Sequence, residues 1–523
     1  MVNWLYQSIG LIFKNKSDKI KMWLRFGESH IPFGVWLFSL EVDSMKVVVI
    51  GAGVVGSLIA REFCKYDVEV TLIEKNLDVG WGVTKANSAI LHAGYDDPPG
   101  TTRARFCSKG NAMYDQLAKE LDIEVKRIGS YVVAFDEQEF KVLEKLLNQG
   151  KTNNVPGLEI HDRNEVLKRE PNLNPQVLAG LWAPTAGITE PWNVAVAAVE
   201  NAISNGLKLI LGEKVVGFEF HGTRIKKVIT DKNSYDADLV VNAAGLFADE
   251  IAKLAGAEYV PLYPRRGEYI LMDKKLGKIV NSVIFPTPSS ISKGILILPT
   301  VDGGLLLGPT AEDLPEDMKQ NLGTTSSGLR QIKDFVKKLV PNIDYSFVVK
   351  TFAGLRPESP QKDFFLGPSK VVANFINAMA MRSPGLTAAP AIAKYIVEDV
   401  TQGQLAFKLE RKKDFNPYRK AIKKMVELPL EEWQRIVQEN PAAGRLVCFC
   451  NEVTEAEIIE AIRRGARTLD GIKFRTRAMF GRCQGGFCSI RIMKILQREL
   501  GVDMSQIVLK SPGSWIVDGR VRE

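Results

Sequence analysis

Short apolar runs rich in β-branched residues alternate with amphipathic stretches from about residue 45 onward. The run KVVVI at 46–50 is apolar without interruption, which is typical of a parallel strand buried on both faces. A helix over 56–66 and a second strand over 68–74 complete one βαβ unit. Further strands are expected at 240–244, 294–300 and 304–310, and further helices at 193–205 and 326–339. This alternation predicts an α/β fold.

The two ends of the chain differ from this pattern. Residues 1–44 contain one apolar run, 31–42, which is shorter than the roughly 20 residues needed to cross a bilayer and has no cleavage site after it. We therefore expect no transmembrane segment, and we interpret Met45 as the natural start and 1–44 as an over-extended reading frame; a weak membrane-surface helix is the alternative. Near 406–425 the chain is densely charged and carries Pro417, which indicates a connecting segment.

Composition is that of an ordinary globular protein of two to four domains, with 523 residues, 45% hydrophobic and 25% charged. The net charge of +8 is spread along the chain, so nothing predicts a nucleic-acid partner. Six cysteines are too few for a disulfide scaffold, but four of them crowd the C-terminal stretch 448–488. That crowding indicates a metal site.

The first chemical motif is GAGVVG, 51–56, which follows a strand and opens a helix. Gly51 allows a tight turn, Gly53 lets a pyrophosphate approach the backbone, and Gly56 lets the helix pack closely on the strand. Glu74 ends the second strand, where a carboxylate accepts from a ribose hydroxyl. A plain strand–helix turn is the alternative, but the full βαβ context favours a dinucleotide site. The motif alone does not separate NAD from FAD.

The following segments carry a resemblance: GAGVVG (51–56), TKANSAILHAG (84–94), VNAAGLFADEIAKLAG (241–256), RRGEYILMD (265–273), FAGLRPESP (352–360) and SPGLTAAPAIA (383–393). Through them the chain resembles the D-amino-acid-oxidase-like superfamily of FAD oxidoreductases over about 45–405. Within it, the chain is more similar to FAD-dependent glycerol-3-phosphate dehydrogenases and their 2-hydroxyglutarate-oxidising relatives.

The resemblance implies a Rossmann-like FAD-binding domain interleaved with an antiparallel-sheet substrate domain. The FAD-binding domain would comprise 45–128, 190–258 and 350–405, and the substrate domain 129–189 and 259–349. A connecting segment, 406–440, would lead to a small helical iron–sulfur module, 441–505, and a tail, 506–523.

The resemblance also implies the cofactor contacts. Glu74 would hold the adenosine ribose, with Lys75 beside it, and Val215 would meet the adenine through its backbone. Gly245 would close over the pyrophosphate. The flavin and pyrophosphate would further be lined by Thr84, Ala86, Asn87 and Ser88, and the flavin N1–C2=O edge would receive N–H groups of Gly385, Leu386 and Thr387. Helix-end N–H groups suit this place because they stabilise the negative charge of a reduced flavin.

Substrate residues are expected on the same basis. Arg356 lies where this superfamily places an arginine over the flavin, and its planar fork suits a carboxylate or phosphate. Arg266 and Lys293 are further candidates for a cationic pocket; the alternatives are surface charges or an ion pair with Glu268. His92, in LHAGY, is the candidate general base for an alcohol proton, and a structural histidine is the alternative.

The second motif is a CxC pair, Cys448 and Cys450, followed by a CxxxxC pair, Cys483 and Cys488. Four thiolates suit zinc or an iron–sulfur cluster. VCFCNEVTEAEI and KFRTRAMFGRCQGGFC resemble the bacterioferritin-associated-ferredoxin-like module, which implies a [2Fe-2S] cluster. We expect nearby cations to offset the charge of its thiolates: Lys473, Arg475, Arg477 and Arg482.

Together these features predict an FAD-dependent dehydrogenase that oxidises sn-glycerol 3-phosphate to dihydroxyacetone phosphate. Electrons would pass from FAD via the [2Fe-2S] cluster to a quinone or a partner subunit, such as a flavin/NAD oxidoreductase. The alternatives are a 2-hydroxy-acid dehydrogenase of the L-2-hydroxyglutarate type, an amine or opine dehydrogenase, and a non-catalytic electron-transfer subunit. The expected location is cytoplasmic, at most peripheral at the inner membrane face.

Overall fold

The computed structural model describes residues 9–11, 22–24, 44–288 and 294–519. It divides into two units, Met1–Met45 and Lys46–Glu523. In the first unit, β1 (Ile9–Leu11) and β2 (Met22–Leu24) pair antiparallel. The apolar run 31–42, for which a membrane-surface helix was one interpretation, lies outside the described residues. No helix within the described ranges has the length and apolar character needed to cross a bilayer.

The second unit contains a six-stranded sheet with the strand order β11-β4-β3-β15-β23-β22. All neighbouring pairs are parallel except β22–β23. The strands are β3 (Lys46–Ile50), β4 (Glu69–Glu74), β11 (Lys208–Leu211), β15 (Leu239–Asn242), β22 (Phe365–Pro368) and β23 (Phe375–Met379). The central strand β15 is buried throughout and β3 is buried from Val47 onward, as the continuous apolar run at 46–50 predicts.

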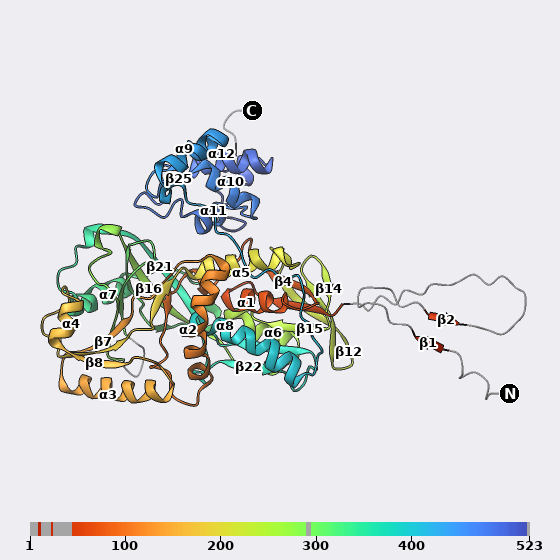
Figure 1. The fold of residues 1–523 in the computed structure, drawn as a ribbon, viewed down its shortest axis with the longest axis horizontal. Helices are drawn as coiled ribbons and strands as arrows, with labels where there is room; N and C mark the ends of the chain where they lie inside the picture. The colour runs from red at the N-terminus through yellow and green to blue at the C-terminus, as the bar shows by residue number, and fades with distance from the viewer. Residues whose placement is uncertain (1–8, 12–21, 25–43, 289–293, 520–523) are drawn as a thin grey trace, which may run out of the picture. The chain divides into compact units, whose positions relative to one another are not determined.

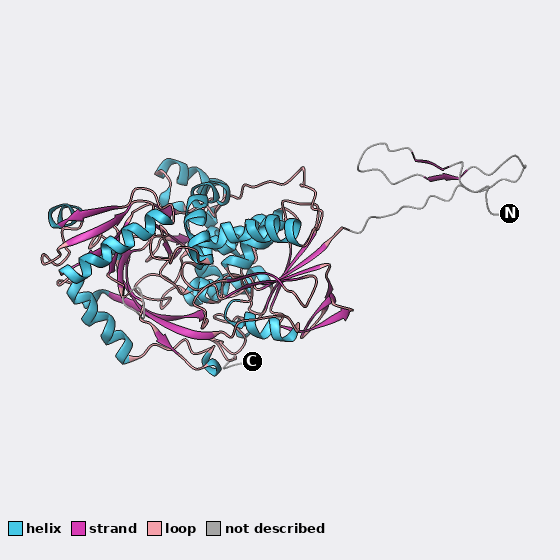
Figure 2. Cartoon of the chain, turned by 90° about the horizontal axis from the view of Figure 1, so that it is seen from below, coloured by secondary structure: helices cyan, strands magenta, loops and turns pink. Residues whose placement is uncertain are grey.

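Both faces of this sheet are covered (Figures 1 and 2). The helix α1 (Val54–Phe63) packs on β3 and β4 and also contacts α5 (Pro191–Ser204) and α8 (Gly385–Lys394), which in turn lies against α2 (Thr102–Leu121). Val48 and Ile50 instead join a core cluster with α6 (Ala248–Leu254) and an antiparallel meander. The meander consists of β12 (Val215–His221), β13 (Arg224–Thr230) and β14 (Ser234–Asp236).

A second, nine-stranded sheet has the order β20-β16-β19-β18-β17-β7-β9-β8, with β21 paired to β16. It is antiparallel except for the pair β17–β7. Alternate residues of β7 face two apolar clusters: Val132 packs with α3 (Glu137–Thr152) and Val133 with α7 (Ser326–Leu339). The strands are β7 (Ser130–Ala134), β8 (Glu159–Asp162), β9 (Ala179–Ala183), β16 (Tyr263–Met272), β17 (Val283–Pro286), β18 (Leu296–Pro299), β19 (Leu305–Gly308), β20 (Glu312–Asp313) and β21 (Val348–Glu358).

The C-terminal module has its own apolar core. Its elements are α9 (Leu430–Glu439), β24 (Leu446–Cys448), β25 (Val453–Thr454), α10 (Glu455–Arg463), α11 (Leu469–Thr476) and α12 (Ser489–Leu500). Thr454 and Glu457 form a capping box that begins α10. Ahead of the module, the carbonyl of Asn416 accepts from the side-chain amides of Asn201 and Asn205, so the charged connecting segment is attached to α5 and its end.

The expected fold class is confirmed: an α/β region with a mainly parallel sheet and an interleaved, mainly antiparallel sheet is followed by a small helical module. Sequence periodicity places β3 and α7 at their observed bounds, while α1 begins two residues before the expected 56. Two features were not expected. Helix α9 lies inside the segment interpreted as a connection, and β21, assigned mostly to the FAD-binding domain, pairs along its length with β16 of the second sheet.

One buried side chain joins the meander to the six-stranded sheet, and its removal is the first test. The amide of Asn374 is fully buried; it accepts from the backbone of Ile225 and donates to the carbonyls of Ile225 and Asp238. Asn374→Ala leaves these groups without partners, so we expect a loss of about 3 kcal/mol, seen as a lower melting temperature. Asn172→Ala, at an exposed amide with one bond to Ile279, is the matched control and should change stability by less than about 1 kcal/mol. Equal effects of the two substitutions would contradict this assignment.

Candidate functional site

A cavity lies where the two sheets meet. The carboxyl ends of β3, β15 and β23 supply one wall, which is where ligands bind on open α/β sheets. The second sheet supplies the other wall through β16, β17, β18 and β21. The lining includes Gly53, Thr84, Asn87, Ser88, His92, Gly245, Arg265, Tyr269, Phe285, Thr310, Arg356, Arg382, Ser383, Gly385 and Leu386.

The glycine motif shapes the β3 end of the cavity. Gly51 has φ +100°, and a Cβ there would lie 2.5 Å from the carbonyl oxygen of Ala243, so only glycine fits. A Cβ on Gly56 would overlap the Gly51 carbonyl oxygen. The amide of Val54 donates to Thr84 Oγ1 at 3.0 Å, and the N-cap residue Gly53 has no side chain to bond the next amides of α1. The helix therefore begins at the cavity wall with its N-terminus open to a ligand.

Glu74 is buried beside this loop rather than in the cavity lining. Its Oε2 accepts from the Ala52 amide at 2.9 Å, and its Oε1 accepts from the backbone and side chain of Asn76. The ammonium of Lys75 lies 3.1 Å from the centre of the Phe247 ring. Val215 begins β12, two residues after Glu213, whose amide donates to the Glu74 carbonyl. These three expected cofactor residues thus lie together, where β4 ends and β12 begins.

The loop 84–88 is held in shape by its own polar groups. Asn87 donates to the carbonyls of Val83 and Thr84 and accepts from the Ala89 amide. Ser88 Oγ lies 3.3 Å from the hydroxyl of Tyr269, which ties the loop to β16. Ala86 does not line the cavity, because its carbonyl packs directly against Gly354 of β21.

Helix α8 also begins at the cavity. The Gly385 amide donates to the Arg382 carbonyl at 2.6 Å, so this N–H is already used. The amides of Leu386 and Thr387 have no acceptor among the residues described. Thr387 Oγ1 accepts from the His92 amide and so attaches the helix start to β5 (Ile90–Leu91) and the residue after it. Two of the three expected N–H groups therefore remain for a ligand.

Arg356 is half-buried and faces the cavity. Its guanidinium donates to the carbonyls of Thr310 (2.7 Å), Arg266 (3.3 Å) and Arg265 (3.4 Å). Across the described part of the chain, no carboxylate comes within ion-pair distance of it, and burial lowers the pKa of Arg356. A half-buried cation whose described hydrogen-bond partners are all neutral carbonyls can accept an anionic ligand.

The structure places Arg265, not Arg266, in the cavity beside Arg356. Arg265 lies directly opposite Arg356 on the neighbouring strand. The side chain of Arg266 leaves the other face of β16, where it pairs with Glu312 and lies 3.5 Å from Glu268. The expectation for Arg266 therefore fails for a simple reason: successive residues of a strand point to opposite faces. Lys293, the other expected cation, lies outside the described residues.

Two arginines at the cavity share one carboxylate. Glu358 is fully buried and pairs with Arg265 at 2.9 Å and Arg382 at 2.8 Å. Arg265 also forms a two-bond ion pair with Asp313. Three guanidiniums thus meet two carboxylates, which leaves one positive charge at this end of the cavity. Alternation along β16 would have revealed Arg265, but Arg382 has no such signal in the sequence.

His92 lines the cavity, and its Nε2 lies 3.1 Å from Ser383 Oγ. Its ring centre is 6.0 Å from that of Phe285 on β17. The imidazole is therefore held between the start of α8 and the second sheet. This position allows proton transfer with a ligand in the cavity and also fits a structural role.

The four C-terminal cysteines form two pairs. Cys450 and Cys483 have their sulfurs 3.7 Å apart, and Cys448 and Cys488 share a hydrogen bond. That hydrogen bond and the amides of Met479, Asn451 and Cys450 lower the pKa of Cys448 to about 6, and the amide of Phe487 lowers that of Cys483. Within the described chain, no three Cys, His, Asp or Glu side chains converge as one metal ion would require. Two thiol pairs instead suit the two irons of a [2Fe-2S] cluster.

The three arginines expected to offset the negative charge of the thiolates instead form ion pairs with carboxylates outside the module. Arg475 forms two hydrogen bonds with Asp78, Arg477 pairs with Glu190 and Asp302, and Arg482 pairs with Asp273. Lys473 is buried against Phe480, and burial lowers its pKa to about 8. These arginines therefore belong to an interface with the rest of the chain.

Comparison with known proteins agrees with both sites. Residues 46–399 match the family model "FAD dependent oxidoreductase", and residues 446–498 match "BFD-like [2Fe-2S] binding domain". A glycerol 3-phosphate dehydrogenase of Caloramator mitchellensis is 45% identical over 475 residues, 90% of this chain and 98% of that protein. The human mitochondrial L-2-hydroxyglutarate dehydrogenase is 25% identical, covering 70% of this chain and 90% of that one.

A solved structure is similar in fold. The L-alpha-glycerophosphate oxidase of Mycoplasma pneumoniae, with FAD bound, superimposes with a TM-score of 0.66 at 28% identity. The match covers 72% of this chain and 98% of that protein. Almost none of that protein is therefore left to correspond to the C-terminal module.

The residues present fit both cofactors. The cofactors are FAD and a [2Fe-2S] cluster. For FAD, two helix N-termini with unused N–H groups open on one cavity, and the turn that leads into α1 has no space for a Cβ at Gly51 or Gly56. For the cluster, four thiols stand in two pairs with backbone N–H groups directed at their sulfurs.

Gly51→Ala tests the cofactor cradle. The new Cβ would strike the Ala243 carbonyl at a φ that alanine avoids, so we expect the purified protein to hold less than about a tenth of the wild-type flavin. The measurement is the ratio of flavin to protein absorbance. Gly82→Ala, which has ordinary φ and open space around its Cβ, is the control and should retain flavin. Full flavin content in the Gly51 variant would show that the loop tolerates a side chain.

Cys450→Ser and Cys488→Ser test the cluster site, one from each pair. A serine is a poor ligand for iron, so each should lower bound iron to less than about a tenth while flavin is retained. Iron analysis and visible absorbance give the result. Cys107→Ala, at a buried cysteine far along the chain from the motif, should leave iron unchanged. Wild-type iron in both serine variants would exclude these ligands.

Proposed function

The chain belongs to the family of FAD dependent oxidoreductases, and on that premise we propose that it oxidises sn-glycerol 3-phosphate to dihydroxyacetone phosphate. The observation that carries the proposal is Arg356, a desolvated cation in the cavity with no carboxylate partner among the described residues. A phosphate supplies the missing charge and accepts from Nη1, the guanidinium nitrogen that donates to none of the three neighbouring carbonyls. The name of the 45% identical relative supports the choice of substrate.

The arrangement of charges favours one dianionic group over two separate carboxylates. Arg265 and Arg382 pair with Glu358, Arg265 also pairs with Asp313, and Arg356 lies opposite Arg265, so one excess positive charge is concentrated at one end of the cavity. A 2-hydroxy diacid would need a second cationic group at a distance from the first. L-2-Hydroxyglutarate is therefore the weaker candidate substrate, although one relative is named an L-2-hydroxyglutarate dehydrogenase.

The chain's residues would divide the remaining work. FAD, when bound, accepts the hydride from carbon 2 of the substrate. The amides of Leu386 and Thr387 would stabilise negative charge on the cofactor, and Gly53 and Gly245 would receive its pyrophosphate. His92, held by Ser383, would take the proton from the substrate hydroxyl. Arg356 would orient the substrate by its phosphate.

The C-terminal module indicates how electrons leave the enzyme. The oxidase relative lacks a counterpart of this module, whereas the dehydrogenase relative matches over 475 residues and must extend into it. The acceptor we propose is therefore not oxygen but a quinone or a partner subunit, such as a flavin/NAD oxidoreductase, reached through the cluster. A cytoplasmic location stays a prediction.

Anaerobic reduction of the bound flavin tests the substrate. Glycerol 3-phosphate should bleach the flavin rapidly, while L-2-hydroxyglutarate and a panel of amino acids should not. Arg356→Met should lower kcat/KM for glycerol 3-phosphate by about 10²–10³-fold, because among the described residues it removes the one cavity cation that has no carboxylate partner. The control is Arg266→Met, which removes a guanidinium from the opposite face of the same strand.

Each other outcome has a clear meaning. If only a hydroxy acid or an amino acid bleaches the flavin, the proposed substrate is wrong and the assignment of the cofactors is unaffected. No bleaching by any compound would favour a non-catalytic electron-transfer subunit.

A further inference from the structure

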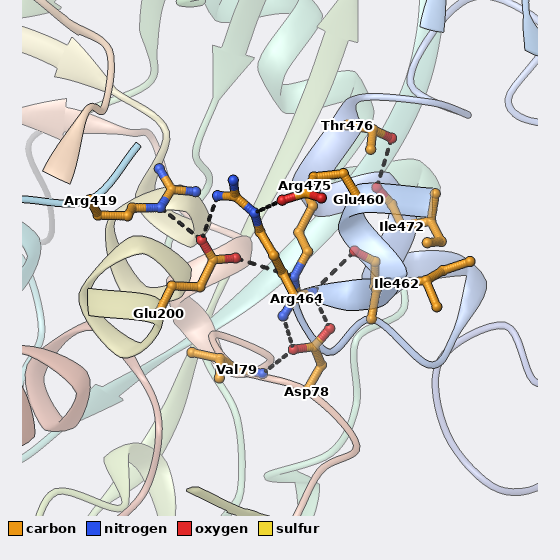
Figure 3. Close-up of polar contacts among 12 residues, drawn as sticks. Asp78, Val79, Glu200, Arg419, Glu460, Ile462, Arg464, Ile472, Arg475 and Thr476 are labelled. Atoms are coloured by element: carbon orange, nitrogen blue, oxygen red, sulfur yellow. Dashed lines mark hydrogen bonds and ion pairs between the residues drawn. The ribbon is translucent and has the colours of Figure 1, made fainter. Parts of the chain in front are cut away.

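Two buried side chains join the C-terminal module to the loop that precedes the cavity. Asp78 lies between β4 and Val83, and 2% of its side chain is exposed. Its two carboxylate oxygens accept from Arg475 of α11 at 2.5 and 2.8 Å, and 6% of the Arg475 side chain is exposed (Figure 3). A two-bond pair shielded in this way is among the strongest contacts that charged side chains form.

A second carboxylate, Glu200 on α5, extends this contact to the connecting segment. It pairs with Arg419 of that segment at 2.7 Å, with Arg464 after α10 at 3.3 Å, and with Arg475 at 3.8 Å (Figure 3). Glu460 also binds Arg464. Three carboxylates, Asp78, Glu200 and Glu460, thus balance three guanidiniums, and the charges come from three separate parts of the chain.

Aromatic rings fill the space beside these ion pairs. Trp81 and Trp192, from the oxidoreductase side, both contact Phe474 of α11, with ring centres 5.5 and 5.3 Å apart. Trp192 also stacks on Phe480, at 5.5 Å. Trp81 lies two residues before Val83 of the cavity lining, and Phe480 lies three residues before Cys483. The rings therefore connect the cavity loop to the cysteine loop by direct contact.

We propose that Asp78, Glu200 and Arg475 form a latch that holds the cluster-binding module in one fixed position against the cavity loop. These are positioning residues: they touch neither the cavity nor the cysteines, and they set the distance over which electrons move between the two cofactors. The proposal rests on the electron route of the proposed function. By contrast, the pair Arg482–Asp273 at the edge of the interface is more than half exposed at Arg482 and contributes little.

Protease sensitivity tests the latch without any catalysis. Asp78→Asn and Arg475→Gln each leave the other member buried without its charge partner, so the module should separate more often. Trypsin should then cut the segment 406–440 about ten times faster than in the wild-type holoenzyme. Asp115→Asn and Lys494→Gln remove the same kinds of charge from exposed positions and should be cut at the wild-type rate.

Cofactor reduction tests the positioning role. Deazaflavin with light and EDTA reduces the enzyme flavin in the absence of any substrate, so this assay does not depend on the identity of the substrate. In the latch variants, flavin bleaching should proceed as in the wild type, and dithionite should still give the full paramagnetic signal of the reduced cluster. Transfer of electrons from the reduced flavin to the cluster, which takes one electron at a time, should be slower by about tenfold or more.

The double variant Asp78→Asn/Arg475→Gln distinguishes a latch from general damage. If the two residues act through one contact, the double variant should be no worse than either single variant, and Arg475→Lys should lie between wild type and Arg475→Gln. Wild-type proteolysis and wild-type cluster reduction in the single variants would overturn the proposal. The proposal would also be overturned if the effects of the two substitutions added up in the double variant and the variants lost flavin. That result would show that the two residues only support the fold. Failure of glycerol 3-phosphate to bleach the flavin would overturn the proposed substrate and leave the latch untouched.

Discussion

A guanidinium withdrawn from bulk water needs an anion, and this chain meets that requirement in two ways. Arg475 is enclosed with Asp78 and Glu200, and its charge is used to join parts of the protein. Arg356 receives only backbone carbonyls from the described residues, so its charge remains for a ligand. Burying either charge without its partner would cost several kcal/mol. The same physical constraint therefore identifies both the internal interface and the substrate end of the cavity.

The fold places these charges by bringing two sheets together. The parallel sheet ends its strands at the cavity and supplies two helix N-termini, which suit the phosphates and the reduced ring of FAD. The second sheet contributes rigid side chains from β16 and β21, so Arg265 and Arg356 stand directly opposite each other. A site built from strands of one sheet and helix ends of another is held on both sides, which is what precise orientation for hydride transfer requires.

The sequence and the structure agree most closely where a residue's position depends on its neighbours along the chain. The glycines of 51–56 and the cysteine pairs occupy positions that their neighbours along the chain define, and both lie where a dinucleotide and a two-iron cluster fit them. Sequence and structure differ where a role depends on which face of a strand a residue occupies or on a partner far along the chain. The expected cavity residue Arg266 pairs with Glu312 on the far face of β16. Arg475 and Arg477, expected to offset the thiolate charge, pair with Asp78 and Glu190, which are hundreds of residues away in the sequence. Helix α9 was hidden by the charged segment before it.

The central claim is that Arg356 holds the phosphate of the substrate. Titration of the oxidised holoenzyme with dihydroxyacetone phosphate tests it most directly, because this product cannot reduce the flavin and its binding perturbs the visible flavin spectrum. We predict a saturable perturbation that is lost in Arg356→Met and that unphosphorylated dihydroxyacetone does not produce. An equal perturbation by dihydroxyacetone, or unchanged affinity for the phosphate in the Arg356 variant, would contradict the account.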